Sequence, residues 1–241
     1  MKRMRLYISL IIIMTSFAAA YCANPRSIRH HCSSDTTEIS ELLRRGFESG
    51  ITNPNKLIAQ YARWLLDKPY VAHTLEGDEE MLTINIDELD CTTSVETLYA
   101  LARTTLNKRY SWRDYAQNLE NIRYRGGEIK GYASRLHYIS DWIIDNNHRG
   151  NLREVTHDMS GVKYNVKSIN FMSKHRDLYP ALADDATYQS IRNVERGYTN
   201  HRFPFLKMEW TNMKKLLKDL QEGDIIGLVT TIEGLATQHM G

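Results

Sequence analysis

One cysteine stands where a reactive thiol is expected. Cys91 lies in the string DELDCTTSVET, between a stretch that alternates like a strand and a run with helical periodicity. The free N–H groups and the positive dipole end of a helix stabilise a thiolate, and they lower a cysteine pKa from about 8.5 toward neutrality. Cys91 is therefore a candidate nucleophile, although a free cysteine is also often a small buried apolar residue.

A cysteine nucleophile needs a base, and histidine usually supplies it. Of the nine histidines, most fall in the N-terminal tail or in polar, loop-like stretches. His239 differs because it begins a strand that is expected to pair with GDII at residues 223–226, where the backbone is rigid. The fold brings such pairs together from distant positions, so His239 is a candidate base, although spacing alone does not select it.

The residues around Cys91 predict the elements that position it. Apolar and polar residues alternate over residues 82–86, which predicts a half-buried strand. A helix with an apolar face follows from about Cys91. Asp90 can cap this helix, or Thr93 can do so with Glu96 three residues on, as in a capping box. Either cap puts Cys91 in or just before the first turn.

Helical patterns dominate the rest of the chain until its last third. A short helix is expected over residues 38–45, capped by Thr36 or Thr37 and stopped by Gly46, and a second one begins at Asn53-Pro54. Further helices are expected over residues 115–122, 132–147 and 188–194. Strand patterns cover residues 162–172 and 223–231, and another strand begins near Thr237.

This order predicts an α+β fold with a helical N-terminal part packed on an antiparallel sheet. The last strand has only begun when the sequence reaches Gly241. A lone hairpin is marginally stable. We therefore expect the sheet to be incomplete and the sequence to be part of a longer protein.

The first twenty residues have the pattern of an export leader. A cationic start is followed by an apolar run that is too short to cross a bilayer and by Ala18-Ala19-Ala20 as a cleavage signal. This predicts a signal peptide over residues 1–20, a linker over 21–34, one domain over 35–241, and a periplasmic or extracytoplasmic location without a membrane span. A lipid anchor at Cys22 is the less favoured alternative, because Tyr21 replaces the small residue usual before a lipidated cysteine.

Composition limits the other classes of function. Apolar residues make up 42% and charged residues 25% of the 241-residue chain, which is typical of a soluble globular domain. The net charge of +2 falls below zero once the three basic leader residues are removed, so nothing supports nucleic-acid binding.

Three cysteines are too few for a disulfide scaffold, although Cys22 and Cys32 could pair. The string RHHC at residues 29–32 lacks a second cluster at zinc-site spacing, so no metal site is predicted.

The order of short motifs resembles a known family. PY, then DC at a helix start, then GDII and HMG resemble the NlpC-type papain-like cysteine hydrolases. The longer strings LDCTTSVET, IRYRGGEIKGYASRLHYISDW, FMSKH and GLATQHMG resemble the N-acetylmuramoyl-L-alanine amidase-like branch. Asp67 and His73 stand where the family often has glycine, and Ala236 stands where it is often acidic.

The resemblance implies an exported hydrolase, without metal or cofactor, that cuts the amide between N-acetylmuramic acid and L-alanine in peptidoglycan fragments. Cys91 would be the nucleophile and His239 the base, with Tyr70 beside the scissile carbonyl. A third residue that orients the histidine lies, in the wider superfamily, on a strand after it, which this sequence does not contain.

Further residues are candidate substrate contacts. On the expected helix over residues 132–147, Arg135, Tyr138 and Trp142 share one face, which suits stacking on a sugar and binding a carboxylate. His137 lies on the same helix and is a further candidate. The alternative is that this stripe is core packing. Glu96 is equally a candidate cap or ligand contact.

Two other functions stay open at this point. A γ-D-glutamyl endopeptidase would use the same cysteine and histidine on the stem peptide. An inactive copy would bind peptidoglycan without cleaving it.

Overall fold

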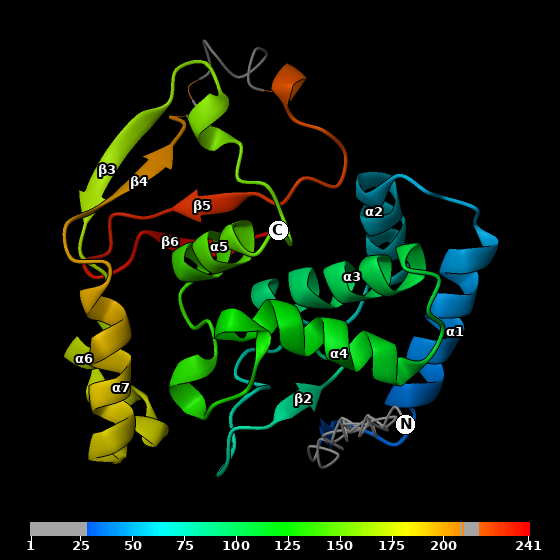
Figure 1. Ribbon diagram of the computed structural model, residues 1–241, viewed down its shortest axis with the longest axis horizontal. Coiled ribbons are helices and arrows are strands. Elements are labelled where there is room, and N and C mark those ends of the chain that lie inside the picture. The colour runs from blue at the N-terminus through cyan, green and yellow to red at the C-terminus, as the bar shows by residue number, and fades with distance from the viewer. Residues whose placement is uncertain (1–27, 208, 210–216) are drawn as a thin grey trace, which may run out of the picture.

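The computed structural model describes residues 28–207, 209 and 217–241 (Figure 1). Helices and three two-stranded sheets make up this part of the chain, so the predicted α+β class is confirmed. None of the described helices is both long and apolar enough to cross a bilayer. The expected leader over residues 1–20 and Cys22 lie outside the described residues.

Four helices form the part of the molecule that holds Cys91. They are α1 (Asp35–Glu48), α2 (Pro54–Trp64), α3 (Cys91–Leu106) and α4 (Trp112–Arg123). α3 contacts each of the other three, and Figure 1 shows α3 and α4 side by side in the middle of the molecule. Apolar side chains from all four helices form one buried cluster. As predicted, α2 begins after Asn53, whose side chain accepts a hydrogen bond from the backbone of Lys56 (3.0 Å).

The first helix differs from its prediction at both ends. α1 begins at Asp35 after Ser34 and continues through Gly46 to Glu48, so neither threonine caps it and the glycine does not stop it. A Cβ atom at Gly46 would overlap the hydroxyl group of Tyr61. The glycine therefore allows α1 and α2 to approach closely, a use of glycine that local sequence cannot distinguish from a helix stop.

A short parallel strand pair lies beside these helices. β1 (Ile28–His30) pairs with β2 (Leu82–Ile84). Residues 28–30 were expected in a linker, and this assignment is corrected because they form a strand. All three residues of β2 are buried, so the strand is covered on both faces rather than half-buried. Burial on both faces is usual for parallel strands.

Two antiparallel pairs follow. β3 (Lys163–Lys167) pairs with β4 (His201–Phe205), and β5 (Gly227–Val229) pairs with β6 (Thr237–Met240). The predicted strand over residues 162–172 is shorter because α6 (Phe171–Lys174) begins within it, whereas α7 (Asp185–Arg196) extends the prediction for residues 188–194. The described strands form separate pairs rather than the single antiparallel sheet that was expected.

The expected helix over residues 132–147 is only partly correct. A 3-10 turn, η2 (Tyr132–Ser134), is followed by extended backbone at Arg135, and α5 (Ile139–His148) begins after Tyr138. Arg135 forms an antiparallel bridge with Tyr124, and the Leu136 N–H donates to the carbonyl of Arg123 (3.0 Å). These contacts with the end of α4 replace helical hydrogen bonds, so Arg135 and Tyr138 do not share a helix face with Trp142.

Candidate active site

Cys91 is the first residue of α3. The side chain of Asp90 accepts a hydrogen bond from the Thr93 N–H (2.8 Å), and the Thr93 hydroxyl accepts one from the Asp90 N–H (2.8 Å). This reciprocal capping box leaves the remaining N–H groups of the first turn available beside Cys91. The thiol is free and half-buried, and it lies 3.8 Å from the Thr92 hydroxyl. Of the two predicted caps, Asp90 is the one that forms.

Tyr70 lies beside this cysteine. The backbone of Tyr70 forms a parallel bridge with Leu89, two residues before Cys91, and the Val71 N–H donates to the Leu89 carbonyl (3.2 Å). Burial raises the pKa of Tyr70, and hydrogen bonding to the Cys91 side chain raises it further. The residue as a whole is 67% exposed. The structure thus brings together two of the residues named from the sequence, with the phenol open to a ligand.

The same loop contains two backbone positions that favour glycine. Asp67 and His73 have φ angles of 68° and 64°, in the left-handed region that side chains with a Cβ rarely adopt. These are the positions at which this chain departs from the glycines common in the family it resembles.

His239 lies on β6, opposite Leu228 of β5. Its neighbour Met240 is fully buried in a cluster with Val95 and Trp142, and β6 contacts both α3 and α5. Val95 is one helical turn after Cys91, so this packing holds the strand against the first turns of α3. The His239 side chain is exposed. Within the described chain, no hydrogen bond joins it to Cys91.

Glu96 lies in the interior. It is 1% exposed, and its carboxylate accepts a hydrogen bond from Nε of Arg123 (2.6 Å), whose side chain is also buried. Burial raises the pKa of Glu96, while the guanidinium of Arg123 opposes this effect. Glu96 is neither the helix cap nor open to a ligand, so both roles suggested for it are corrected.

Tyr138 and Trp142 are also internal. Trp142 is 0% exposed. The Tyr138 hydroxyl donates to Glu195 of α7 (2.7 Å) and accepts from the Met172 N–H (2.7 Å). Ser173, in the FMSKH string, also donates its N–H to Glu195 (3.0 Å). The core-packing alternative is therefore the correct one for these two aromatic residues.

Arg135 and His137 have different surroundings. His137 Nε2 lies 2.8 Å from the Tyr132 carbonyl, and burial lowers its pKa to about 3. Arg135 forms ion pairs with Glu76 (2.9 Å) and Glu80 (3.3 Å). Neither glutamate was singled out from the sequence. The acidic string EGDEE at residues 76–80 was the available signal, but only the fold shows which cation it faces.

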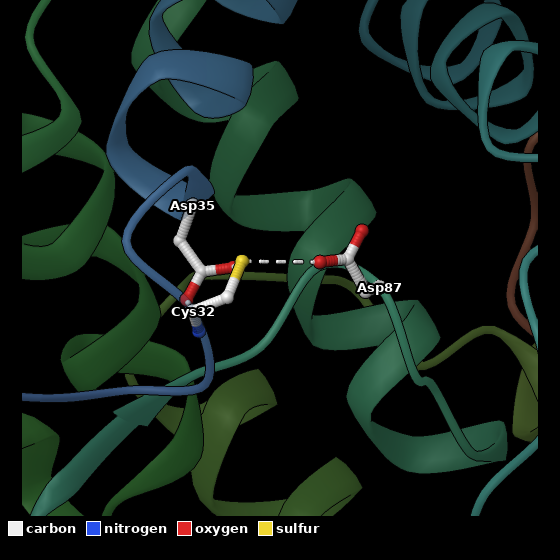
Figure 2. A group of neighbouring side chains, drawn as sticks. All are labelled: Cys32, Asp35 and Asp87. Carbon is white, nitrogen blue, oxygen red and sulfur yellow. Dashed lines mark hydrogen bonds between the residues drawn. The ribbon is translucent and has the colours of Figure 1, made fainter.

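The second described cysteine has another environment (Figure 2). Cys32 lies between Asp35 and Asp87, with its sulfur 3.3 Å from Asp87 Oδ2, and the three ligand-type atoms lie within 4.8 Å of one another. Lys68 donates to Asp87 (2.9 Å) and holds the pKa of that carboxyl below its usual value. The ammonium group of Lys68 already pairs with one of the two carboxylates, and the hydrogen bonds of Cys32 tie the turn before α1 to the segment before α3. Pairing of Cys32 with Cys22 stays a prediction.

The geometry describes an α+β protein with a half-buried thiol at a helix start and a phenol beside it. The model of the N-acetylmuramoyl-L-alanine amidase-like family matches residues 60–241, and the chain belongs to that family. A crystal structure of an N-acetylmuramoyl-L-alanine amidase from Bacteroides uniformis is 39% identical with a TM-score of 0.71, covering 78% of this chain and 79% of that one.

Other comparisons agree on the fold. A second crystal structure of a Bacteroides uniformis N-acetylmuramoyl-L-alanine amidase has a TM-score of 0.69 at 38% identity, with 78% of this chain and 79% of that one covered. A Legionella pneumophila protein shares the fold at 18% identity and a TM-score of 0.61, over 86% of this chain and 78% of that one. No curated protein matches the chain.

Proposed function

We propose that this chain is an exported cysteine amidase that hydrolyses the amide between the lactyl group of N-acetylmuramic acid and L-alanine in peptidoglycan fragments. The observation that carries the proposal is the free Cys91 thiol in the first turn of α3 with Tyr70 at its side, in a member of an amidase-like family. The papain-like NlpC-type fold, the leader over residues 1–20 and the domain over residues 35–241, with β1 as an added N-terminal strand, belong to the same proposal.

The proposed reaction has two halves. Cys91 gives its proton to His239, and the resulting thiolate attacks the lactyl carbonyl and forms a carbon–sulfur bond, while N–H groups of the first turn of α3 bind the developing oxyanion. His239 protonates the nitrogen of L-alanine, and the carbon–nitrogen bond breaks to leave a thioester. Water then gives a proton to His239 and attacks the thioester, which releases the lactyl acid and restores the thiol.

β6 packs against the helix that begins at Cys91. Met240 is buried in the cluster that contains Val95 of α3. Because successive side chains of a strand point to opposite faces, the exposed His239 side chain points away from that cluster. Hydrogen bonds between catalytic groups are often formed only when substrate is bound. The proposal therefore requires the exposed His239 side chain to reach Cys91 when substrate binds.

Mass spectrometry of products from N-acetylmuramoyl-L-alanyl-D-glutamate tests the proposal. We expect L-alanyl-D-glutamate and the free sugar acid, and a loss of roughly 10³-fold or more in kcat for Cys91→Ser. Cys32→Ser is the matched control, because Cys32 is the other free, half-buried thiol of the described chain. His239→Asn should also lose activity, whereas His157→Asn, at an exposed histidine, should not.

The other functions give different results. Cleavage of a longer stem peptide after D-glutamate, which leaves L-alanyl-D-glutamate attached to the sugar, would identify a γ-D-glutamyl endopeptidase. Slow labelling of Cys91 by a thiol reagent together with no cleavage would identify an inactive copy.

A further inference from the structure

Arg135 is a buried cation with few hydrogen bonds. Its side chain is 7% exposed, and a guanidinium has five N–H donors. Among the described residues, that side chain donates one hydrogen bond, from Nη2 to Glu76 (2.9 Å). Its buried Nε lies 3.3 Å from Glu80 Oε1 without forming a hydrogen bond. Buried Arg123, in contrast, donates to both Glu96 and the Thr83 carbonyl.

Unbonded donors on a buried charge are costly, because the group has lost its water without a replacement. The backbone cannot move to relieve this cost, since Arg135 is held by its bridge to Tyr124. The guanidinium is therefore well placed to take up a further acceptor that approaches from outside.

The two carboxylates beside Arg135 are held differently. The Glu80 side chain is 7% exposed and accepts a hydrogen bond from the Tyr124 hydroxyl (2.7 Å). The Glu76 side chain is 41% exposed, and its one hydrogen bond among the described residues goes to Arg135. Glu80 is thus the fixed counter-ion of Arg135, whereas another carboxylate can take the place of the Glu76 carboxylate.

Exchange requires only rotation of the Glu76 side chain. The neighbouring backbone is held in place, because Arg29 donates to the Leu75 carbonyl (2.7 Å) and to Thr83 of β2 (2.9 Å). Exposed side chains change rotamer within nanoseconds. Loss of the Glu76 contact would therefore uncover the guanidinium without unfolding the loop.

Aromatic rings border the same place. The guanidinium lies over the Tyr132 ring, 5.0 Å from its centroid. Tyr179 is half-buried, and the nearby charge of Glu76 adds to the effect of burial in raising its pKa. A cation over one partly exposed aromatic ring, with a second ring near its counter-ion Glu76, suits a ligand that carries both an anionic group and apolar surface.

We propose that Arg135 is a carboxylate-binding subsite that Glu76 occupies in the free protein and that a carboxylate of the stem peptide occupies in the complex. This inference rests on the proposed function for its substrate class. A ligand carboxylate can accept two parallel N–H bonds from the guanidinium fork, where Glu76 accepts one. The loop that contains Glu76 also contains Tyr70, so the subsite and the thiol are bordered by one segment.

The test compares N-acetylmuramoyl-L-alanyl-D-glutamate with the analogue in which both glutamate carboxylates are amides. Glu76→Gln removes the internal competitor while keeping the side-chain size, so the KM for the acid should fall about tenfold and the KM for the diamide should stay within about twofold. Glu79→Gln makes the same charge change three residues away and should alter neither KM. Arg135→Lys should raise the KM for the acid and remove the preference for it.

Two results would overturn the proposal. Glu76→Gln could raise the KM for both substrates alike, which would mean that Glu76 only supports the loop, or it could leave the preference unchanged. If the natural chain cleaves neither substrate, the proposed function fails, and calorimetric binding of L-alanyl-D-glutamate and its diamide to the same chains still decides the subsite. Stronger binding of the acid by Glu76→Gln than by the natural chain supports it, and equal binding refutes it.

Discussion

Removal of the Glu96 carboxylate tests whether this residue supports the fold or the substrate. In the structure the carboxylate is buried and lies 2.6 Å from Nε of Arg123. Glu96→Ala would leave the guanidinium of Arg123 buried with only the Thr83 carbonyl as acceptor. Breaking such a buried pair costs about 3–5 kcal/mol, because one charge remains without its partner.

The size of this effect is measurable. For a chain of this length, 1 kcal/mol shifts the melting temperature by about 2–4 °C, so Glu96→Ala should lower it by about 6–20 °C. Urea unfolding should show the matching loss of free energy. The double change Glu96→Leu with Arg123→Met removes both charges and should recover a large part of the loss.

A surface pair of the same chemistry is the control. Glu41 and Arg44 lie three residues apart on α1, and their side chains are 51% and 56% exposed. Glu41→Ala should change stability far less than Glu96→Ala, because water screens an exposed pair. If Glu96→Ala changes stability as little as Glu41→Ala but raises KM, the carboxylate faces the substrate and the reasoning from burial is wrong.

Three other changes test separate features. Gly46→Ala should lower the free energy of unfolding in urea by about 1–3 kcal/mol, because the new methyl group overlaps the hydroxyl of Tyr61. The control Gly197→Ala, without such an overlap, should lower it by less than about 1 kcal/mol. His73→Gly should leave stability unchanged or raise it by up to about 1 kcal/mol, since φ is 64° there, and a clear loss in the same assay would contradict this. Burial lowers the pKa of His137 from 6.5 to about 3. Between pH 6.5 and pH 3 the unfolded chain therefore binds more protons than the folded chain, and stability falls as pH falls. The free energy of unfolding should drop by about 2 kcal/mol from pH 7 to pH 5, and an equal drop in His137→Gln would refute this assignment.

Local rules correctly predicted the elements that depend on neighbouring residues. Asn53-Pro54 starts α2 and Asp90 starts α3, because a cap needs only a side chain within a few residues of the free N–H groups. The hairpin of β5 and β6 was predicted for a similar reason, since its turn and apolar alternation are adjacent in sequence.

Predictions failed where a distant contact outweighed the local preference. The run over residues 132–147 has a helical pattern, yet Arg135 takes an extended conformation because it pairs with Tyr124. Gly46 was expected to end a helix, but Tyr61 on the next helix determines its role. Residues 28–30 have a polar context, and their strand exists only because β2 accepts them as a partner.

In the candidate site, too, features set by neighbouring residues were predictable and features set by distant contacts were not. Residue types and short spacings were enough to place Cys91 at the start of a helix, because the dipole and the free N–H groups of that helix belong to a single local segment. The same information could not assign partners to charged side chains. Glu96 faces Arg123, and Arg135 faces Glu76 and Glu80, because these contacts join segments 27 to 59 positions apart in the chain. Burial and pairing of charges are properties of the packed chain, so they emerge only when those segments come together.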